Sequence, residues 1–197
     1  MKKIIGFYIS SISLAMLPLL GFPQAGTLDS TFSGDGIAIL SQSSGYDEAR
    51  DVVALPDSTL LICGGVETSG FIMRILNDGE PDMAFGTDGR IDFQYGISTA
   101  AIKLIILTDN KIVVSGNTMV TSGDREFFIA RFLPDGSPDL TFNSTGHLVS
   151  SYSSSTWESC YAMTIQADGK FVLAGQTGVG SDLLFMRVNT NGTIDMS

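Results

Sequence analysis

The sequence has very little of the chemistry on which most catalytic and metal sites depend. It contains one histidine, His147, and one tryptophan, Trp157, among 197 residues. A single histidine without a partner at a fixed spacing argues against a Ser-His-Asp triad and against a zinc site built from imidazoles. We therefore predict that His147 is a solvated strand residue. We also predict that the protein is not an enzyme, with no catalytic residues and no bound cofactor.

Basic residues are also scarce, with 11 lysines and arginines against 21 aspartates and glutamates. Lys2 and Lys3 are the only charged residues among the first 25, so the excess of acidic residues is larger in the remaining chain. This balance argues against nucleic-acid phosphates and anionic membrane surfaces as main partners. It suits a soluble secreted protein or a protein that binds a divalent cation.

The hydrophobic stretch at the N-terminus predicts a signal peptide over residues 1–25. The charged "MKK" precedes the apolar "IIGFYISSISLAMLPLLGF", and small residues follow. Cleavage is expected after Ala25, or alternatively after Gly21. An uncleaved membrane anchor is the rival interpretation, although the stretch is barely long enough to span a bilayer. The predicted location is the bacterial periplasm or outer membrane, or outside the cell, with no membrane span after signal removal.

One glycine-bounded motif recurs along the rest of the chain. "GTLDSTFSGDG" begins at Gly26, "GEPDMAFGTDG" at Gly79 and "GSPDLTFNSTG" at Gly136, and a fourth copy begins as "GTIDMS" at Gly192. The spacings of 53, 57 and 56 residues indicate a repeat architecture. The predicted repeats are residues 26–78, 79–135 and 136–191, with the start of a fourth at 192.

Each repeat contains four short apolar runs rich in Val, Ile and Phe, which is typical of strands. In the second repeat these runs are "GRIDFQ", "AIKLIIL", "KIVVSGN" and "FFIARFL". Polar turns such as "ADGK" separate the second and third runs, and no helical period is visible after residue 25. The predicted fold is all-β: a partial β-propeller of about three four-stranded antiparallel blades over residues 26–197.

The motif is predicted to join the last strand of one blade to the first strand of the next. Its glycines permit turns, and its phenylalanine anchors the crossing between sheets. A repeated arginine lies eight residues before each later motif aspartate, inside an apolar run where an unpaired charge is costly. We therefore predict a repeated Arg–Asp pair. The structural repeat residues are Asp29, Asp82, Asp139, Phe32, Phe85, Phe142, Arg74, Arg131 and Arg187.

The patterns "G-x-L-D-x-T-F-x-x-x-G", "A-D-G-K-F-V-L-A-G" and "F-I-A-R-F-L-P-D-G" resemble the delta-60 repeat (DUF5122-type), a family of bacterial exported proteins of unknown function. The resemblance covers residues 26–197. It implies a β-propeller fold and an envelope or secreted location, and it carries no catalytic residues to this sequence. Such proteins usually hold many repeats, whereas three are present here.

Three blades fall short of the roughly four to eight that close a propeller. An open arc leaves apolar faces and strand edges that need neighbours. The chain is therefore expected to pair with a second copy into a six-blade ring, to dock onto other proteins, or to be a fragment of a longer product. The first two alternatives make association with protein partners or with itself the expected function.

The two cysteines occupy small positions of the repeat, because Cys63 matches Ser115 and Ala174 while Cys160 matches Ala101. A whole blade separates them, so we predict two free, mostly buried thiols. Asp and Asn also cluster in "NDGEPD" (77–82), "TDG" (87–89) and "PDGSPD" (134–139), which partly fits a calcium loop. Turn capping explains the same residues, and calcium is kept as the alternative to no cofactor.

The segment "SSYSSSTWES" (150–159) departs from its counterparts in the other repeats. Its aromatic residues, Tyr152 and Trp157, are candidate contacts for a protein partner or a sugar, and an ordinary connecting loop is the plainer interpretation. An enzymatic interpretation would need non-repeated carboxylates such as Glu126 or Glu158.

These patterns favour a non-enzymatic structural or interaction subunit of a bacterial cell-envelope assembly, such as an outer-membrane or secretion-apparatus complex. Partner chains would complete its blade faces. The alternative is a secreted ligand-binding propeller, for carbohydrate or calcium, closed by homo-oligomerisation. Tight ligand binding by the purified protein without a partner would favour that alternative.

Overall fold

The computed structural model describes residues 26–41, 44–150, 157–178 and 182–197. These residues form eleven β-strands and no helix, so this part of the chain has no helix able to cross a membrane. The predicted signal peptide, residues 1–25, lies outside the described residues.

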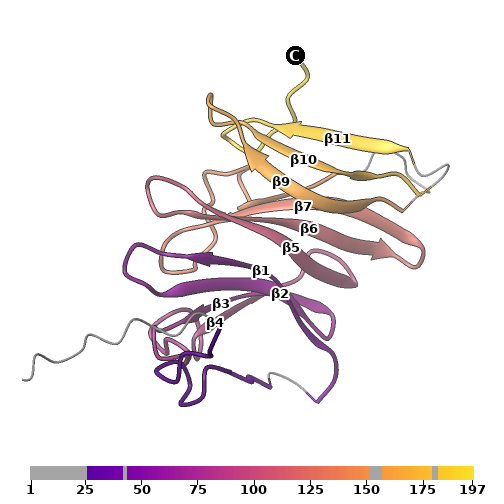
Figure 1. The fold of residues 1–197 in the computed structure, drawn as a ribbon. Helices are drawn as coiled ribbons and strands as arrows, with labels where there is room; N and C mark the ends of the chain where they lie inside the picture. The colour runs from indigo at the N-terminus through magenta and orange to yellow at the C-terminus, as the bar shows by residue number, and fades with distance from the viewer. Residues whose placement is uncertain (1–25, 42–43, 151–156, 179–181) are drawn as a thin grey trace, which may run out of the picture.

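The strands form three antiparallel sheets that follow one another along the chain (Figure 1). The first sheet has the order β1-β2-β3-β4, the second β5-β6-β7-β8, and the described part of the third β9-β10-β11. This arrangement confirms the predicted all-β fold of a partial propeller. The strand bounds are Asp47–Ala54 (β1), Leu60–Val66 (β2), Ser69–Ile75 (β3), Arg90–Phe93 (β4), Ser98–Ile106 (β5), Ile112–Thr121 (β6), Asp124–Phe132 (β7), His147–Ser150 (β8), Ser159–Ile165 (β9), Phe171–Gln176 (β10) and Leu183–Val188 (β11).

Each sheet begins with a hairpin closed by a short polar turn. A turn aspartate accepts a hydrogen bond through Oδ1 from the backbone N–H two residues later, at Asp57, Asp109 and Asp168. The next residue has a positive φ, which is 65° at Asn110 and 83° at Gly169. Asparagine and glycine tolerate this left-handed conformation, so the polar turns predicted from the sequence close the hairpins as expected.

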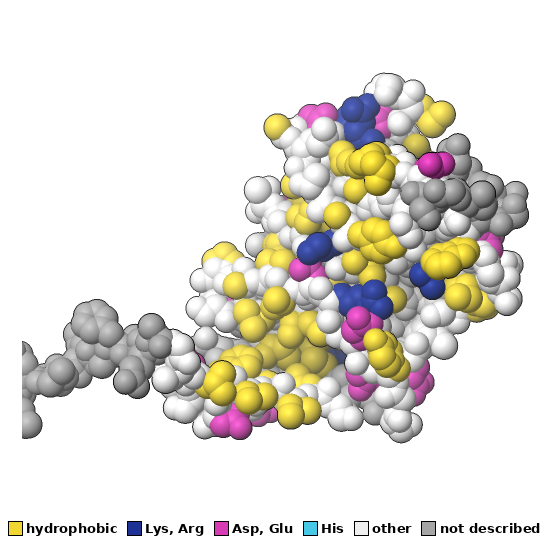
Figure 2. All heavy atoms as spheres, turned by 45° about the vertical axis from the view of Figure 1, so that its right-hand side comes forward, with side chains coloured by type: hydrophobic (Ala, Val, Ile, Leu, Met, Phe, Trp, Pro, Cys, Tyr) yellow, Lys and Arg dark blue, Asp and Glu magenta, His cyan; other side chains and the backbone are white. Residues whose placement is uncertain are grey.

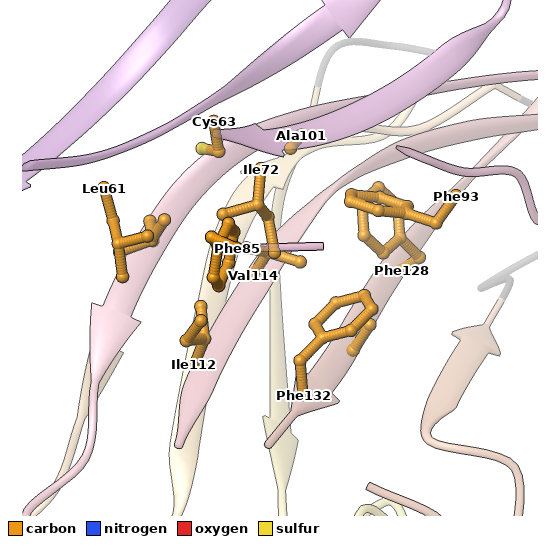
Figure 3. Close-up of a cluster of buried hydrophobic side chains, with 12 residues drawn as sticks. Leu61, Cys63, Ile72, Phe85, Phe93, Ala101, Ile112, Val114, Phe128 and Phe132 are labelled. Atoms are coloured by element: carbon orange, nitrogen blue, oxygen red, sulfur yellow. The ribbon is translucent and has the colours of Figure 1, made fainter. Parts of the chain in front are cut away.

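The three sheets stack face to face, with a hydrophobic cluster in each interface. Alternate residues of a strand point to opposite faces, so neighbours such as Val113 and Val114 belong to different clusters. The second sheet is therefore covered on both faces, which explains its nearly continuous apolar runs. The first interface includes Leu61, Ile72, Phe85, Val114 and Phe128 (Figure 3). The second interface includes Val113, Ile129, Phe142, Phe171 and Leu173.

The motif does not connect one sheet to the next, so that prediction is wrong. Residues 79–89 join β3 to β4, which pair antiparallel through Ile72 and Ile91, and residues 136–146 join β7 to β8 in the same way. The apolar run after each motif pairs back with the strand before the motif. Each complete sheet therefore takes its fourth strand from the following sequence repeat, because a repeat pattern does not reveal where a sheet begins.

A bulge interrupts the pairing of the first two strands at the same repeat position in all three sheets. A glycine lies opposite the bulge in each case: Gly64, Gly116 and Gly175. A Cβ atom on any of the three would overlap a backbone carbonyl oxygen of the neighbouring strand. Glycine is required there because the two backbones approach closely.

Candidate interaction surfaces

The repeated arginine and the motif aspartate form an ion pair in every sheet, as predicted. In the second sheet, Arg131 Nε lies 2.8 Å from Asp139 Oδ2, and the guanidinium lies over the Phe142 ring at 4.8 Å from its centroid. The corresponding distances are 2.7 Å for Arg74 Nη2 to Asp82 Oδ2 and 2.6 Å for Arg187 Nε to Asp195 Oδ2. The predicted residues therefore form one Arg–Asp–Phe unit per motif in the first two sheets.

The second-sheet unit is buried, and its contacts satisfy both charges. Asp139 Oδ1 accepts hydrogen bonds from the Thr141 N–H and hydroxyl at 3.0 and 2.6 Å. Burial alone would raise the pKa of Asp139. The hydrogen bonds from Thr141, with smaller contributions from Arg131 and Lys111, outweigh burial and lower that pKa to about 2. Arg131 Nη1 also donates to the Thr190 carbonyl at 2.7 Å, which ties the second sheet to the third.

Two of the three motif phenylalanines lie between sheets, although the motif itself joins strands of one sheet and not two sheets as predicted. Phe85 is buried in the first interface and Phe142 in the second. Phe32 is half-buried and packs against the other face of the first sheet. In that first motif, Asp29 accepts hydrogen bonds from Thr31, which hold the pKa of Asp29 below its usual range.

The same positions that form the two buried interfaces are exposed on the third sheet. The residue two before the repeated arginine is Ile72 in the first sheet and Ile129 in the second, and both are buried. Its counterpart in the third sheet is Phe185, which is 66% exposed. Likewise Phe127 is 1% exposed, whereas its counterpart Leu183 is 79% exposed. We call Val172, Leu183 and Phe185 the third-sheet outer face.

The first sheet has a partly covered face at the opposite end of the stack. Its residues Ile62, Phe71, Met73 and Ile75 match the positions through which the second sheet packs on the first. We call these four residues the first-sheet outer face. Residues 26–40 cross it and leave a groove of about 450 Å³ lined largely by apolar side chains. Figure 2 shows hydrophobic side chains gathered at this lower end of the molecule.

These features define an all-β repeat protein whose successive antiparallel sheets stack as propeller blades. Two segments, residues 107–142 and 166–197, match a family model described as "Domain of unknown function (DUF5122) beta-propeller". Each segment runs through two strands into the motif. The two segments are similar to repeats of this β-propeller family, and over these residues the resemblance predicted from the sequence is confirmed. A search of curated proteins found no match to the chain.

The two cysteines are free and buried, as predicted. Cys63 lies in the first interface and Cys160 in the second, so a sheet separates the two thiols. Burial raises the pKa of Cys63 to about 12 and that of Cys160 to about 11. Both therefore serve as small apolar residues of the interfaces rather than as reactive groups.

His147 is half-buried, which corrects the prediction of a solvated residue. Its ring stacks on Tyr95 with 4.1 Å between ring centroids and 17° between planes. Tyr95 lies in the connection between β4 and β5, and its distance from His147 in the sequence hid the contact. The histidine thus packs β8, the outer strand of the second sheet, against the connection between β4 and β5.

The candidate calcium segments are turns capped by their own aspartates. Asp78 Oδ1 accepts the Glu80 N–H at 3.1 Å, and Asp135 Oδ1 accepts the Ser137 N–H at 2.9 Å. No group of three or more His, Cys, Asp or Glu side chains suited to a metal ion occurs within the described ranges. The geometry of these residues is that of turn stabilisation.

A polar groove of about 220 Å³ lies between the ends of the first two sheets. Its charged side chains include Glu48 and Arg50, and Arg50 Nη2 lies 2.6 Å from Glu48 Oε2. Glu67 and Arg125 also line the groove, so its lining holds two acidic and two basic side chains and carries no net charge.

Of the two predicted contact residues, Trp157 and Tyr152, the structure describes only Trp157. Trp157 is half exposed, and the Arg125 guanidinium lies 5.0 Å from its ring centroid. Tyr152 lies outside the described residues. Glu158 is fully buried and Glu126 half-buried, with burial, followed by the charges of Asp124 and Glu158, raising the pKa of Glu126.

Sequence reasoning missed Leu183 and Phe185 as surface residues. Their run "LLFMRV" has the same alternation as "GFIMRI" and "FFIARF" in the buried strands. A signal for their exposure was available only in the count of repeats, which predicted uncovered faces without naming residues.

Proposed function

We propose that this protein is a non-enzymatic structural subunit of a bacterial cell-envelope assembly that binds protein partners through the outer faces of its end sheets. The observation that carries the proposal is the exposure of Leu183 and Phe185 at positions whose counterparts are buried twice in the same chain. Covering one such side chain is worth about 1.5–3 kcal/mol, so an apolar partner surface would be bound favourably.

The envelope location rests on the predicted signal peptide and on the resemblance to an exported family. An excess of acidic residues agrees with a role away from nucleic acids and anionic lipid surfaces. An outer-membrane or secretion-apparatus complex is the specific assembly that we propose.

The turn-capping geometry of the acidic segments and the neutralised polar groove favour protein binding over the ligand-binding alternative. Glu158, one of the two carboxylates that an enzymatic role would need, is fully buried, which also favours protein binding. The proposal therefore places the function in the sheet faces.

In-cell photo-crosslinking tests this function directly. A photoreactive phenylalanine analogue is placed at position 185 of the full chain, expressed in a Gram-negative host with its signal segment. The matched control carries the analogue at Ser122, an exposed turn residue between β6 and β7. We expect a protein crosslink from position 185 in the envelope fraction and none from position 122. Equal labelling at the two positions, or none at either, would contradict the proposal.

A further inference from the structure

The described structure holds a sheet without a fourth strand and a strand-like segment without a sheet. In the third sheet β11 is an outer strand, whereas β3 and β7 at the same place are followed by β4 and β8. Residues 37–40 occupy the repeat position of β4 and β8, because Gly36 matches the glycines that precede them. These residues form no strand in the structure.

We propose that two copies of the chain associate head to tail. The third-sheet outer face of one copy packs on the first-sheet outer face of the other, and residues 37–40 of that second copy pair with β11 as its fourth strand. This inference rests on the proposed function and names the partner as a second copy.

The two outer faces have the composition of surfaces that already meet inside the chain. Within one copy, Leu61 and Ile72 of one sheet face Val114 and Phe128 of the next. The third-sheet outer face presents Val172 and Phe185 at the positions of the first pair. The first-sheet outer face presents Ile62 and Phe71 at the positions of the second pair. The same packing geometry is therefore available between copies.

Residues 26–40 already sit where the connection of a preceding sheet would sit. The Ser33 N–H donates to the Asp78 carbonyl at 2.7 Å, and the matching Asn143 N–H donates to the Asn191 carbonyl at 2.7 Å. In the second case, that of Asn143, the segment is the connection between β7 and β8 of the second sheet, and it packs on the third sheet. In the first case no preceding sheet lies among the described residues, and the groove of about 450 Å³ lies beside the segment.

The segment also has the alternation of an edge strand. Ala38, Ile39 and Leu40 all border the groove, and along them Ala38 and Leu40 are half-buried whereas Ile39 is 88% exposed. The Ile37 N–H donates to Asp35 Oδ1 at 2.9 Å, so pairing by β-strand addition would use the backbone of residues 38–40. Main-chain hydrogen bonds supply much of the binding in this mode. Two such contacts, related by a two-fold axis, would close two three-sheet arcs into one ring of six.

The solution mass of the exported protein, measured by light scattering after gel filtration, tests the proposal. Wild type is expected at twice the single-chain mass. Phe185→Asp places a charge in the interface, and Ile39→Pro removes a donor and distorts the pairing segment, so each variant is expected at the single-chain mass. Ser122→Asp and Ile39→Ala serve as matched controls and should keep the mass of two chains.

Mixing the two variants gives the sharpest result. Phe185→Asp retains an intact first-sheet end, and Ile39→Pro retains an intact third-sheet end, so one sound interface forms in the mixture and the two-chain mass returns. Both substituted side chains are exposed in the single copy, so circular dichroism should report unchanged β-sheet content.

A single-chain mass for wild type, a larger open-ended assembly, or a mixture that stays at the single-chain mass would each overturn the head-to-tail pair. If wild type is a single chain but position 185 still crosslinks to a different envelope protein, the proposed function stands and this inference fails. If position 185 crosslinks to nothing, both fail.

Discussion

The second and third sheets are built from matching residues, but the same repeat positions are buried in the second sheet and exposed on the third. Phe127 and Ile129 of the second sheet are buried against the third sheet, and their counterparts Leu183 and Phe185 face outward. Strand propensity and alternation are alike in the two places, so the local sequence does not decide burial. What differs is whether a further sheet is stacked on the face, and that makes burial a property of the stack.

The largest expected effect comes from truncating matched positions in the two sheets. Phe127→Ala removes a buried aromatic side chain from the second interface and should lower the free energy of unfolding by about 3–5 kcal/mol. Leu183→Ala should change it by less than about 0.5 kcal/mol in the single-chain state, because Leu183 is exposed. Urea denaturation measures both. A loss at Leu183 that grows with protein concentration would indicate that this face becomes covered.

The second largest expected effect comes from the close approach of two backbones at the bulge of the second sheet. Gly116→Ala should cost about 3 kcal/mol, at the upper end for overpacking, because the new Cβ would meet the Ala100 carbonyl oxygen at the bulge. The control is Gly65→Ala on the equivalent strand of the first sheet, where the nearest atom would be the Ala100 Cβ at 3.5 Å. That variant should be neutral within about 0.5 kcal/mol. Similar losses in the two variants would contradict the close approach.

The buried ion pair of the second sheet predicts a defined pH dependence. The pKa of Asp139 is about 2 in the folded protein and near 3.8 in the unfolded chain, so the unfolded chain binds its proton at higher pH. The resulting stabilisation, about 2 kcal/mol, is fully present above about pH 5 and is lost as the pH falls through about 2. The difference in unfolding free energy between wild type and Asp139→Asn should shrink over this range, as urea titrations at several pH values would reveal. A constant difference would refute the assignment.

The smallest expected effect lies where the second sheet touches the third through a partly exposed pair. Arg125→Ala removes the guanidinium from the face of Trp157 and should cost about 0.5–1 kcal/mol. Because Trp157 is the single tryptophan, its fluorescence reports both the local change and the unfolding transition. An unaltered emission spectrum together with unaltered stability would show that this contact contributes nothing to the interface.

The fold could largely be predicted from the sequence. The motif glycines, the strand glycines and the arginines each recur at matching offsets, so they indicate the same strands and the same turns in every repeat. Glycine at 64, 116 and 175 and arginine at 74, 131 and 187 mark the same points of each sheet. The Arg–Asp pairs followed from the cost of leaving a charge unpaired in an apolar run.

The remaining features depend on contacts that no local pattern contains. The placement of β4 and β8 required knowledge of which neighbour the first run of each repeat pairs with. An antiparallel partner on either side satisfies the same alternation. The stacking of His147 on Tyr95 joins residues on different sheet connections. The exposure of Phe185 depends on the absence of a covering sheet, which the residue itself does not encode.

The borrowing of the fourth strand has a consequence for how the molecule can come apart. Residues 79–135 supply β4 to the first sheet and three strands to the second, so unfolding this repeat damages two sheets at once. A sequence repeat is therefore not an independent folding unit, and the blades should melt together instead of one by one. Each sequence repeat contributes strands to two sheets, and this connectivity alone makes the unfolding of neighbouring sheets cooperative.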